Sequence, residues 1–394
     1  MSLDLTRARR DTPACDTVLH FNNAGAALMP RPVVDAVIDH LQREARLGGY
    51  EAAAAAEGAV EHVYDAAATL LGCQRHEIAF VENATRAWDM AFYAMPFGPG
   101  DRILTAMAEY ASNYIAFLQV ARRTGATIEV IPNDEHGQLS LAGLRQAIDE
   151  RVKLIAITHV PTNSGLVNPA AAVGEIARQA GILYLLDACQ SVGQMPIDVK
   201  QIGCDMLSAT GRKFLRGPRG TGLLYVRRQV LDRLEPPLLD LHAATWVARD
   251  QFTMRPDARR FENWETNYAG KIGLGVAIDY ALSWGLDNIW QRITALASTL
   301  RTRLATLPSV TVHDPGVVRC GIVSFTAVGH EPVEIQRALA QSRINVTVSQ
   351  QSSTRLDMEA RGLTSVVRAS VHYYNSEDEV EGFCATLAAF LGAA

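Results

Sequence analysis

Lysine is scarce in this chain of 394 residues. The 37 basic side chains include 33 arginines and only four lysines, at Lys153, Lys200, Lys213 and Lys271. A lysine amine can attack a carbonyl carbon when burial or neighbouring cations depress its pKa. If the chemistry of this protein needs such an amine, the candidates are therefore few.

Long apolar runs are missing as well. No stretch approaches the about 20 residues that a helix needs to span a bilayer. The N-terminal segment MSLDLTRARRDTPACDTV lacks the apolar centre of a signal peptide, so we expect a cytoplasmic protein. The net charge of −5 provides no basic surplus, which argues against nucleic acid or an anionic membrane surface as a partner.

Cysteine pairs with metal-ligand spacing are also absent. The six cysteines are scattered, and neither a CxxC pair nor a Cys/His cluster occurs. We therefore expect reduced, mostly buried thiols, and neither a metal site nor a disulfide framework.

What is present is a globular composition, with 48% apolar and 20% charged residues. From residue 76 onward, apolar strands alternate with helices, which predicts a parallel sheet covered on both faces. After residue 270, long helices precede a few strands, which predicts a smaller α+β domain. We expect an N-terminal arm over residues 1–30, a large α/β domain over 31–285 and a small C-terminal domain over 286–394.

Polar residues at the expected strand ends are the candidates for a site, because ligands of open α/β sheets bind there. Asp187 ends the apolar strand LYLLDAC, and Lys213 follows the strand DMLSAT. Each has an ordinary alternative, a helix N-cap for the aspartate and a surface amine for the lysine. Arg212 and Arg216 are cations close to Lys213 in sequence, which would lower its pKa.

Two further segments suggest anion binding. Thr85 lies at an expected helix start, where free N–H groups suit a phosphate, although a plain N-cap is the alternative. Arg368 lies in the apolar strand SVVRASV and needs an anion, which is either an internal carboxylate or that of a substrate. A phosphate cradle, a ring-nitrogen partner, an amine and a carboxylate clamp together describe pyridoxal 5'-phosphate (PLP) and an amino-acid substrate.

The chain resembles the class V aminotransferase superfamily of fold-type I PLP-dependent transferases, which includes cysteine desulfurases, selenocysteine lyases, kynureninases and isopenicillin N epimerase. The motifs that carry this resemblance are HFNNAGAALMP, LGGYEA, ENATRAW, AEYASNY, THVPTNSGLVNP, LLDACQSVGQMPIDV, SATGRKFLRGPRGTGLLYV and VRASVHYYNSEDEV. The resemblance implies that Lys213 is catalytic and forms a Schiff base with PLP. It further implies cofactor contacts from Ala84, Thr85, Tyr110, Asp187, Gln190, Thr210 and Arg212, and substrate contacts from Asn23, Tyr50, Asn163 and Arg368.

The chain departs from the pattern of these relatives at three places. The stretch 345–368 contains no cysteine, where cysteine desulfurases carry a nucleophilic one. Arg212 replaces a common histidine before the lysine. In RRFENWETNYAG, Trp264 and Glu265 stand where relatives place a threonine that reaches the phosphate of the neighbouring subunit. We expect Glu265 to face an arginine or the substrate, since a carboxylate repels a phosphate.

The resemblance implies a homodimer with its site at the subunit boundary, but it leaves the reaction open. From the missing cysteine, and from a likeness of LGGYEAAAAA to hercynylcysteine sulfoxide lyase, we expect a C–S β-lyase acting on an S-substituted cysteine or its sulfoxide. We do not expect a persulfide-forming desulfurase. A class V aminotransferase and an amino-acid epimerase or racemase are the alternatives. A further alternative is a non-catalytic binding subunit. The joint presence of Lys213, Asp187 and Arg368 argues against it.

Overall fold

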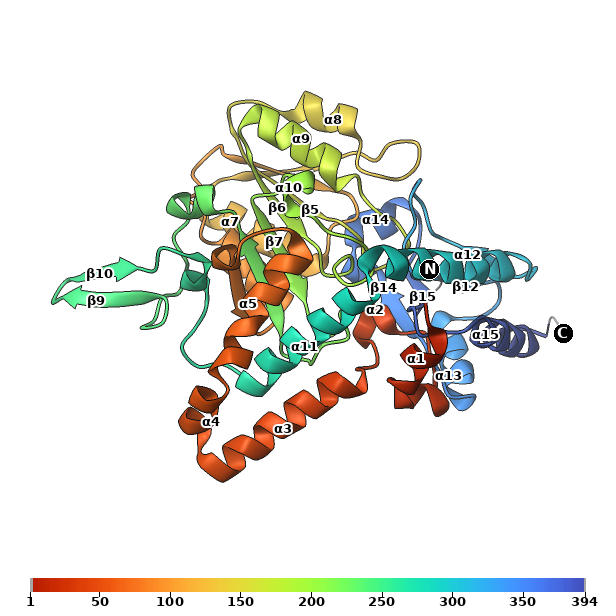
Figure 1. Ribbon diagram of the computed structural model, residues 1–394. Coiled ribbons are helices and arrows are strands. Elements are labelled where there is room, and N and C mark those ends of the chain that lie inside the picture. Colours follow the sequence, from red (N-terminus) through yellow and green to blue (C-terminus); the bar gives the residue numbers. More distant parts are fainter. Residues whose placement is uncertain (1–2, 393–394) are drawn as a thin grey trace.

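The computed structural model describes residues 3–392, and its centre is a seven-stranded sheet (Figure 1). The strand order is β2-β8-β7-β6-β5-β3-β4. Strand β8 is antiparallel to both of its neighbours, and the other neighbouring pairs are parallel, which confirms the predicted mostly parallel α/β sheet. The strands are β2 (Ile78–Val81), β3 (Arg102–Ala106), β4 (Thr127–Ile131), β5 (Val152–Thr158), β6 (Leu183–Asp187), β7 (Met206–Thr210) and β8 (Gly222–Val226).

Both faces of this sheet are buried, as its apolar strands predict. Side chains alternate across a strand, so Ile155 and Ile157 of β5 join one core cluster while Leu154 and Ala156 join another. On the face of the first cluster the sheet is covered by α5 (Glu57–Leu71), α9 (Ala170–Ala180) and α11 (Tyr268–Trp284), among the helices that contribute to that cluster. Helices α6 (Ala84–Phe92) and α7 (Ala111–Thr124) contribute to the second. The sheet is therefore the middle layer of three.

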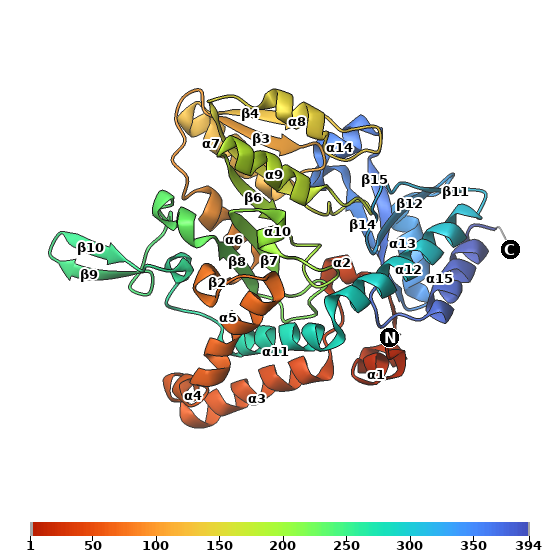
Figure 2. The same cartoon turned by 45° about the horizontal axis from the view of Figure 1, so that its top comes forward.

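The C-terminal part contains a four-stranded antiparallel sheet in the order β11-β12-β15-β14 (Figure 2). Its strands are β11 (Val310–Val312), β12 (Ile322–Ala327), β14 (Thr347–Gln350) and β15 (Ser365–Ser370). The helices of this part are α12 (Leu286–Ala305), α13 (Pro332–Gln341), α14 (Arg355–Ala360) and α15 (Glu377–Phe390). The domain boundaries at residues 30 and 285 stay a prediction.

The N-terminal segment connects this small sheet to the loop that carries Lys213. It contains α1 (Leu5–Arg10), β1 (Leu19–His20) and α2 (Asn23–Ala26), and β1 pairs in parallel with β13 (Ile344–Asn345). The backbone N–H of Ser370 donates to the carbonyl of Phe21 at 2.6 Å, and that of Ala27 donates to the carbonyl of Arg212 at 3.0 Å.

A β-hairpin that the sequence analysis did not identify extends from the body in both views (Figures 1 and 2). Its strands are β9 (Ala244–Ala248) and β10 (Gln251–Met254), and it exposes the large apolar side chains Trp246 and Phe252. The remaining helices are α3 (Arg31–Leu47), α4 (Gly49–Ala55), α8 (Leu141–Ala147) and α10 (Val199–Ile202), with short 3₁₀ turns at Pro13–Asp16, Arg75–Glu77, Arg228–Arg233, Ala258–Phe261 and Gln351–Ser353. Within residues 3–392, no helix has the length and apolar character needed to cross a membrane.

Candidate active site

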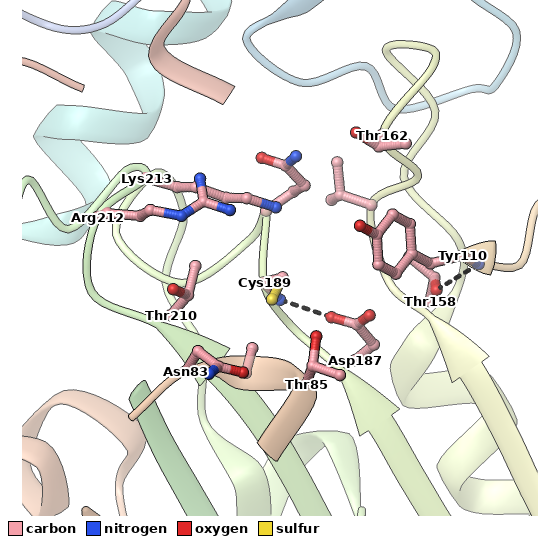
Figure 3. Close-up of a pocket in the computed structure, with 13 residues that line it drawn as sticks. Asn83, Thr85, Tyr110, Thr158, Thr162, Asp187, Cys189, Thr210, Arg212 and Lys213 are labelled. Carbon is pink, nitrogen blue, oxygen red and sulfur yellow. Dashed lines mark hydrogen bonds between the residues drawn. The ribbon is translucent and has the colours of Figure 1, made fainter. Parts of the chain in front are cut away.

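A cavity of about 650 Å³ opens at one edge of the central sheet (Figure 3). Strands β2, β3, β5, β6 and β7 run in the same direction, so their carboxyl ends all meet at this edge, where ligands of open α/β sheets bind. The residues lining the cavity are Asn83, Ala84, Thr85, Tyr110, Thr158, Val160, Thr162, Asp187, Cys189, Gln190, Thr210, Arg212 and Lys213. All the cofactor contacts predicted from the sequence therefore lie around one space.

Lys213 reaches this cavity from the loop that follows β7, and its amine points into the space (Figure 3). Burial, aided by the nearby charges of Arg212 and Arg368, lowers the pKa of the Lys213 amine. A lowered pKa increases the fraction of neutral, nucleophilic amine at neutral pH.

Arg216 does not contribute to this effect, contrary to our expectation. Its guanidinium is buried, lies over the Tyr374 ring and donates to the Tyr373 hydroxyl at 2.7 Å and to the Leu28 carbonyl at 2.8 Å. The backbone of Arg216 has φ of 59°, a left-handed conformation that is uncommon for a residue with a side chain. This turn directs the guanidinium to the N-terminal segment, where it has a structural role.

Asp187 ends β6 as predicted, and its carboxylate is buried. Its Oδ1 accepts a hydrogen bond from the backbone N–H of Cys189 at 2.9 Å, and its Oδ2 accepts one from Asn113 Nδ2 at 2.9 Å. The two hydrogen bonds fix the plane of the carboxylate at the cavity wall. Neither donor is charged, so the negative charge of Asp187 stays available to a cationic group within the cavity.

The N-terminus of α6 supplies an anion-binding cradle. Asn83 is the N-cap, since its side chain accepts the backbone N–H of Arg86 at 2.9 Å, and Thr85 lies inside the first turn. The early N–H groups of a helix have no partner within the helix and attract anions. Thr210, the last residue of β7, and Arg212, in the loop that follows, also line this cavity (Figure 3).

Arg368 approaches from β15 of the small sheet and is only 6% exposed. Its Nη1 donates to the carbonyl and the hydroxyl of Thr162, at 3.0 and 2.6 Å, while its Nε has no partner. Burial and the nearby Arg212 lower its pKa to about 10. A buried guanidinium that lacks a carboxylate partner and lies beside a cavity is suited to bind an anionic ligand.

Other residues predicted at the site lie at its wall or away from it. Asn163 and Asn23 are buried and do not line the cavity. Asn163 donates to Thr354 Oγ1 at 2.8 Å, and Asn23 donates to the carbonyl of Ser370 at 2.7 Å. Both therefore connect the surrounding backbone segments. Tyr50 is 73% exposed on α4 and is also absent from the cavity lining.

Trp264 and Glu265 line a second cavity of about 680 Å³. Glu82 lines this second space and Asn83 lines the first, so each cavity has one lining residue directly before α6. Glu265 is exposed and forms no ion pair within residues 3–392. The expected partner of Glu265 stays a prediction.

Several lining residues were not predicted from the sequence. Thr158 and Thr162 follow or end β5, and Cys189 lies two residues beyond Asp187. The strand-end rule that identified Asp187 would also have found the two threonines, because THVPT directly continues an apolar strand.

The residues present fit PLP. Among the residues that line the cavity, Arg212 and Lys213 are cationic and Asp187 is the carboxylate. Arg368 lies next to the lining, since it donates to Thr162. This excess of positive charge suits a phosphate and a carboxylate. Two buried polar atoms, Arg368 Nε and Gln190 Oε1, have no partner in the structure. Such atoms are costly to bury unless a ligand satisfies them.

The class V aminotransferase family matches residues 19–383. The chain belongs to this family. A probable cysteine desulfurase of Xylella fastidiosa strain 9a5c is 32% identical over 402 residues, covering 98% of this chain and 95% of the relative. The structure of an apo cysteine desulfurase from Thermococcus onnurineus NA1 has a TM-score of 0.92 and 29% identity, covering 100% of this chain and 99% of that chain.

A C-DES mutant with glycine covalently linked to its PLP cofactor has the same fold, with a TM-score of 0.87 at 23% identity over 96% of this chain and 98% of that chain. The fold-type I assignment and the cofactor, PLP, are thereby confirmed.

These relatives overturn two expectations about the reaction. Proteins similar to nearly the whole chain are named cysteine desulfurases, so the predicted β-lyase activity on an S-substituted cysteine is wrong. The exclusion of a persulfide-forming desulfurase is wrong for the same reason. That exclusion rested on the absence of a cysteine from residues 345–368. A missing thiol in one segment does not determine whether the rest of the site can break the bond between Cβ and sulfur.

Proposed function

We propose that this class V enzyme is a cysteine desulfurase that moves the sulfur of L-cysteine to a thiol and leaves L-alanine. The observation that carries the proposal is the buried guanidinium of Arg368, which contacts Thr162 at the wall of a cavity that Lys213 also lines and that is suited to PLP. The names of the relatives support cysteine as the amino acid.

The residues that would hold the cofactor follow from the lining of the cavity. The N-terminus of α6 at Ala84 and Thr85, together with Thr210 and Arg212, would bind the phosphate. Asp187 would hold a proton on the ring nitrogen, and Gln190 and Tyr110, which also line the cavity, would contact the ring. When bound, PLP supplies an electron sink that stabilises negative charge at the α-carbon of the substrate.

The remaining residues would act on the substrate. Arg368 binds its carboxylate and thereby orients the α-carbon toward Lys213. With domain boundaries at residues 30 and 285, as we propose, this clamp comes from the small domain and the amine from the large one. The neutral Lys213 amine takes the proton from Cα and returns a proton to the product.

The overall reaction is balanced as cysteine plus a thiol giving alanine plus a persulfide. The bond between Cβ and sulfur breaks, Cβ gains a hydrogen, and the sulfur forms a new bond to the sulfur of the acceptor thiol. Cβ is reduced by two electrons, and the transferred and acceptor sulfurs are each oxidised by one, so no other oxidant or reductant is needed.

The test is to incubate the PLP-loaded protein with L-cysteine and dithiothreitol. We expect alanine and sulfide in equal amounts, and no turnover of D-cysteine. Pyruvate and ammonia in place of alanine, or no product at all, would contradict the proposal. A parallel reaction without dithiothreitol, followed by mass spectrometry of the intact chain, determines whether one of its cysteines carries the added sulfur atom.

We further propose a homodimer in which the segment with Trp264 and Glu265 closes the site of the partner subunit. Its support is the second cavity, which Trp264 and Glu265 line, and the exposed apolar side chains of the preceding segment, where Leu241 is 70% and Trp246 78% exposed. Exposed apolar patches of this kind are typical of protein interfaces.

A further inference from the structure

A second carboxylate lies behind Asp187, and one asparagine connects the two. Asn113 of α7 donates through Nδ2 to Asp187 Oδ2 at 2.9 Å and to Glu109 Oε1 at 2.8 Å. An amide nitrogen has two hydrogens, so each carboxylate receives one. All three side chains are buried, with 2% of Asn113, 3% of Glu109 and 5% of Asp187 exposed.

Glu109 is held as an acceptor on every side. Besides Asn113, it accepts the backbone N–H of Tyr110 at 2.8 Å, that of Thr158 at 3.0 Å, and the hydroxyls of Thr158 at 2.5 Å and Thr105 at 3.0 Å. Five donors around two oxygens match an ionised carboxylate, because a protonated one would direct its own hydrogen at a donor. None of the five donors is charged, so the negative charge of Glu109 is not neutralised there.

The arrangement leaves Asp187 with limited freedom. One of its oxygens accepts from the Cys189 backbone and the other from Asn113, and Asn113 is in turn held by Glu109. Two like charges close together in a buried site repel each other. A proton on a ring nitrogen next to Asp187 relieves that repulsion, so the charge of Glu109 favours the protonated ring.

We propose that Glu109 is a positioning residue that acts through Asn113 to orient Asp187 and to favour a proton on the ring nitrogen of PLP. The proposal rests on the place given to PLP and Asp187 above. It extends the site beyond the cavity lining, since neither Glu109 nor Asn113 lines the cavity. Glu109 also fixes Tyr110 and Thr158, which do line it.

The decisive measurement is the ¹⁵N NMR resonance of the ring nitrogen in protein loaded with ¹⁵N-labelled PLP, recorded at pH 8. Burial raises the pKa of Glu109 to about 7, so at this pH the wild-type side chain is charged. We expect the Glu109→Gln and Asn113→Ala variants to move the resonance toward that of the neutral ring. Losing one hydrogen bond to a charged group also weakens PLP binding about tenfold.

A matched control is Glu77→Gln. Glu77 is also buried, at 7% exposure, and it accepts the backbone N–H groups of Gln74 and Arg228 at 3.0 and 2.9 Å. It lies directly before β2, at the amino end of that strand, whereas the cavity lies at the carboxyl ends. We expect the ring resonance of Glu77→Gln to match the wild type. A shift of the ring resonance in Glu77→Gln as large as that in Glu109→Gln would show that the loss of any buried carboxylate causes the shift. That result would overturn the proposal.

The outcomes separate this proposal from the proposed function. If both site variants bind PLP with an unchanged ring resonance, Glu109 has no such role, whatever the enzyme does with cysteine. If Glu109→Gln fails to fold, Asn113→Ala decides whether Glu109 acts through the bridge, because it removes the hydrogen bonds that connect Glu109 to Asp187. The wild type could fail to make alanine from cysteine while both variants show a shifted ring resonance. That result would reject the desulfurase proposal and support the positioning role of Glu109.

Discussion

Arg368 donates two hydrogen bonds to Thr162, one to its carbonyl and one to its hydroxyl, although 206 positions separate the two residues. Thr162 follows β5 of the central sheet and Arg368 belongs to β15 of the small one. The contact fixes one nitrogen of the guanidinium and leaves Nε without a partner. The guanidinium that we propose as the carboxylate clamp is therefore held in place without a substrate.

Replacing Arg368 by alanine is expected to lower kcat/KM for L-cysteine by about tenfold to a hundredfold, because a charge-assisted hydrogen bond to the carboxylate is lost. Cysteamine, which is cysteine without its carboxylate, provides the matched comparison. The wild type should discriminate strongly against cysteamine, whereas the variant should not. Steady-state kinetics with both compounds measure the effect. If Arg368→Ala keeps the discrimination, another group binds the carboxylate.

Borohydride reduction of the PLP-loaded protein, followed by peptide mass spectrometry, is expected to locate the cofactor on Lys213. The Lys213→Arg variant should carry no trapped cofactor and should have no activity, since a guanidinium cannot replace the neutral amine. Lys271 is the matched control, because it is also buried and burial also lowers its pKa, but it donates to the Tyr64 hydroxyl and lines the second cavity. Trapping that persists in Lys213→Arg and disappears in Lys271→Arg would contradict the assignment.

His372 is expected to make the fold sensitive to acid. Its Nδ1 accepts the backbone N–H of Tyr373 at 2.9 Å, so its Nε2 carries the proton and donates to the carbonyl of Phe214 at 3.0 Å. Burial lowers the pKa of His372 well below 6.5. Protonation is also unfavourable because a charged ring would carry a second proton on Nδ1, which faces the N–H of Tyr373.

A histidine with a depressed folded pKa contributes stability above its unfolded pKa and loses it as the pH falls. The free energy of unfolding should therefore decrease as the pH falls below about 6.5, and the decrease should be smaller in His372→Gln. Urea unfolding of both proteins at pH 7.5 and pH 5 measures the difference. Burial also lowers the pKa of His159, to about 4. Its contribution to the pH dependence of unfolding is the same in the wild type and in His372→Gln, so it cancels in the comparison. Equal pH dependence in the two proteins would contradict this role.

The β9–β10 hairpin is expected to stabilise a dimer. Trp246 is 78% and Phe252 55% exposed, and removing such apolar area from water favours association. Light scattering after gel filtration should give the mass of two chains for the wild type and a shift toward one chain for Trp246→Ser combined with Phe252→Ser. Val328→Ser, at an equally exposed apolar position, is the control. A single-chain mass for the wild type would reject the dimer, and an unchanged mass for the double variant would reject the hairpin as its contact.

Local patterns predicted the elements because they depend on neighbouring residues. Serine favours the N-cap position of a helix, and the Ser140 side chain, at the start of α8, accepts the backbone N–H of Gly143 at 3.1 Å. The apolar strand before Asp187 is β6, and the stretch before Lys213 is β7. The hairpin at 244–254 was not identified, because its exposed side chains lack the alternation of apolar and polar residues that indicates a half-buried strand.

Side-chain direction was harder to predict than position. Arg216 stands three residues after Lys213, but the left-handed turn at its own backbone sends its guanidinium to Tyr373 and Tyr374. Sequence spacing in a loop does not determine which way a side chain points, because each residue has two free backbone torsions.

The order of the motifs was enough to determine the fold and the cofactor, since apolar strands must be covered and their polar ends must share one edge. That Lys213 is the lysine facing the cofactor stays a prediction. Tertiary structure alone decided which distant groups meet there. Asn113 reaches Asp187 across 74 positions, because β3, the strand before α7, inserts between β4 and β5 rather than lying in sequence order. Contacts of this kind depend on the order of the strands and on which buried polar groups pair with one another. The local sequence around each residue predicts neither.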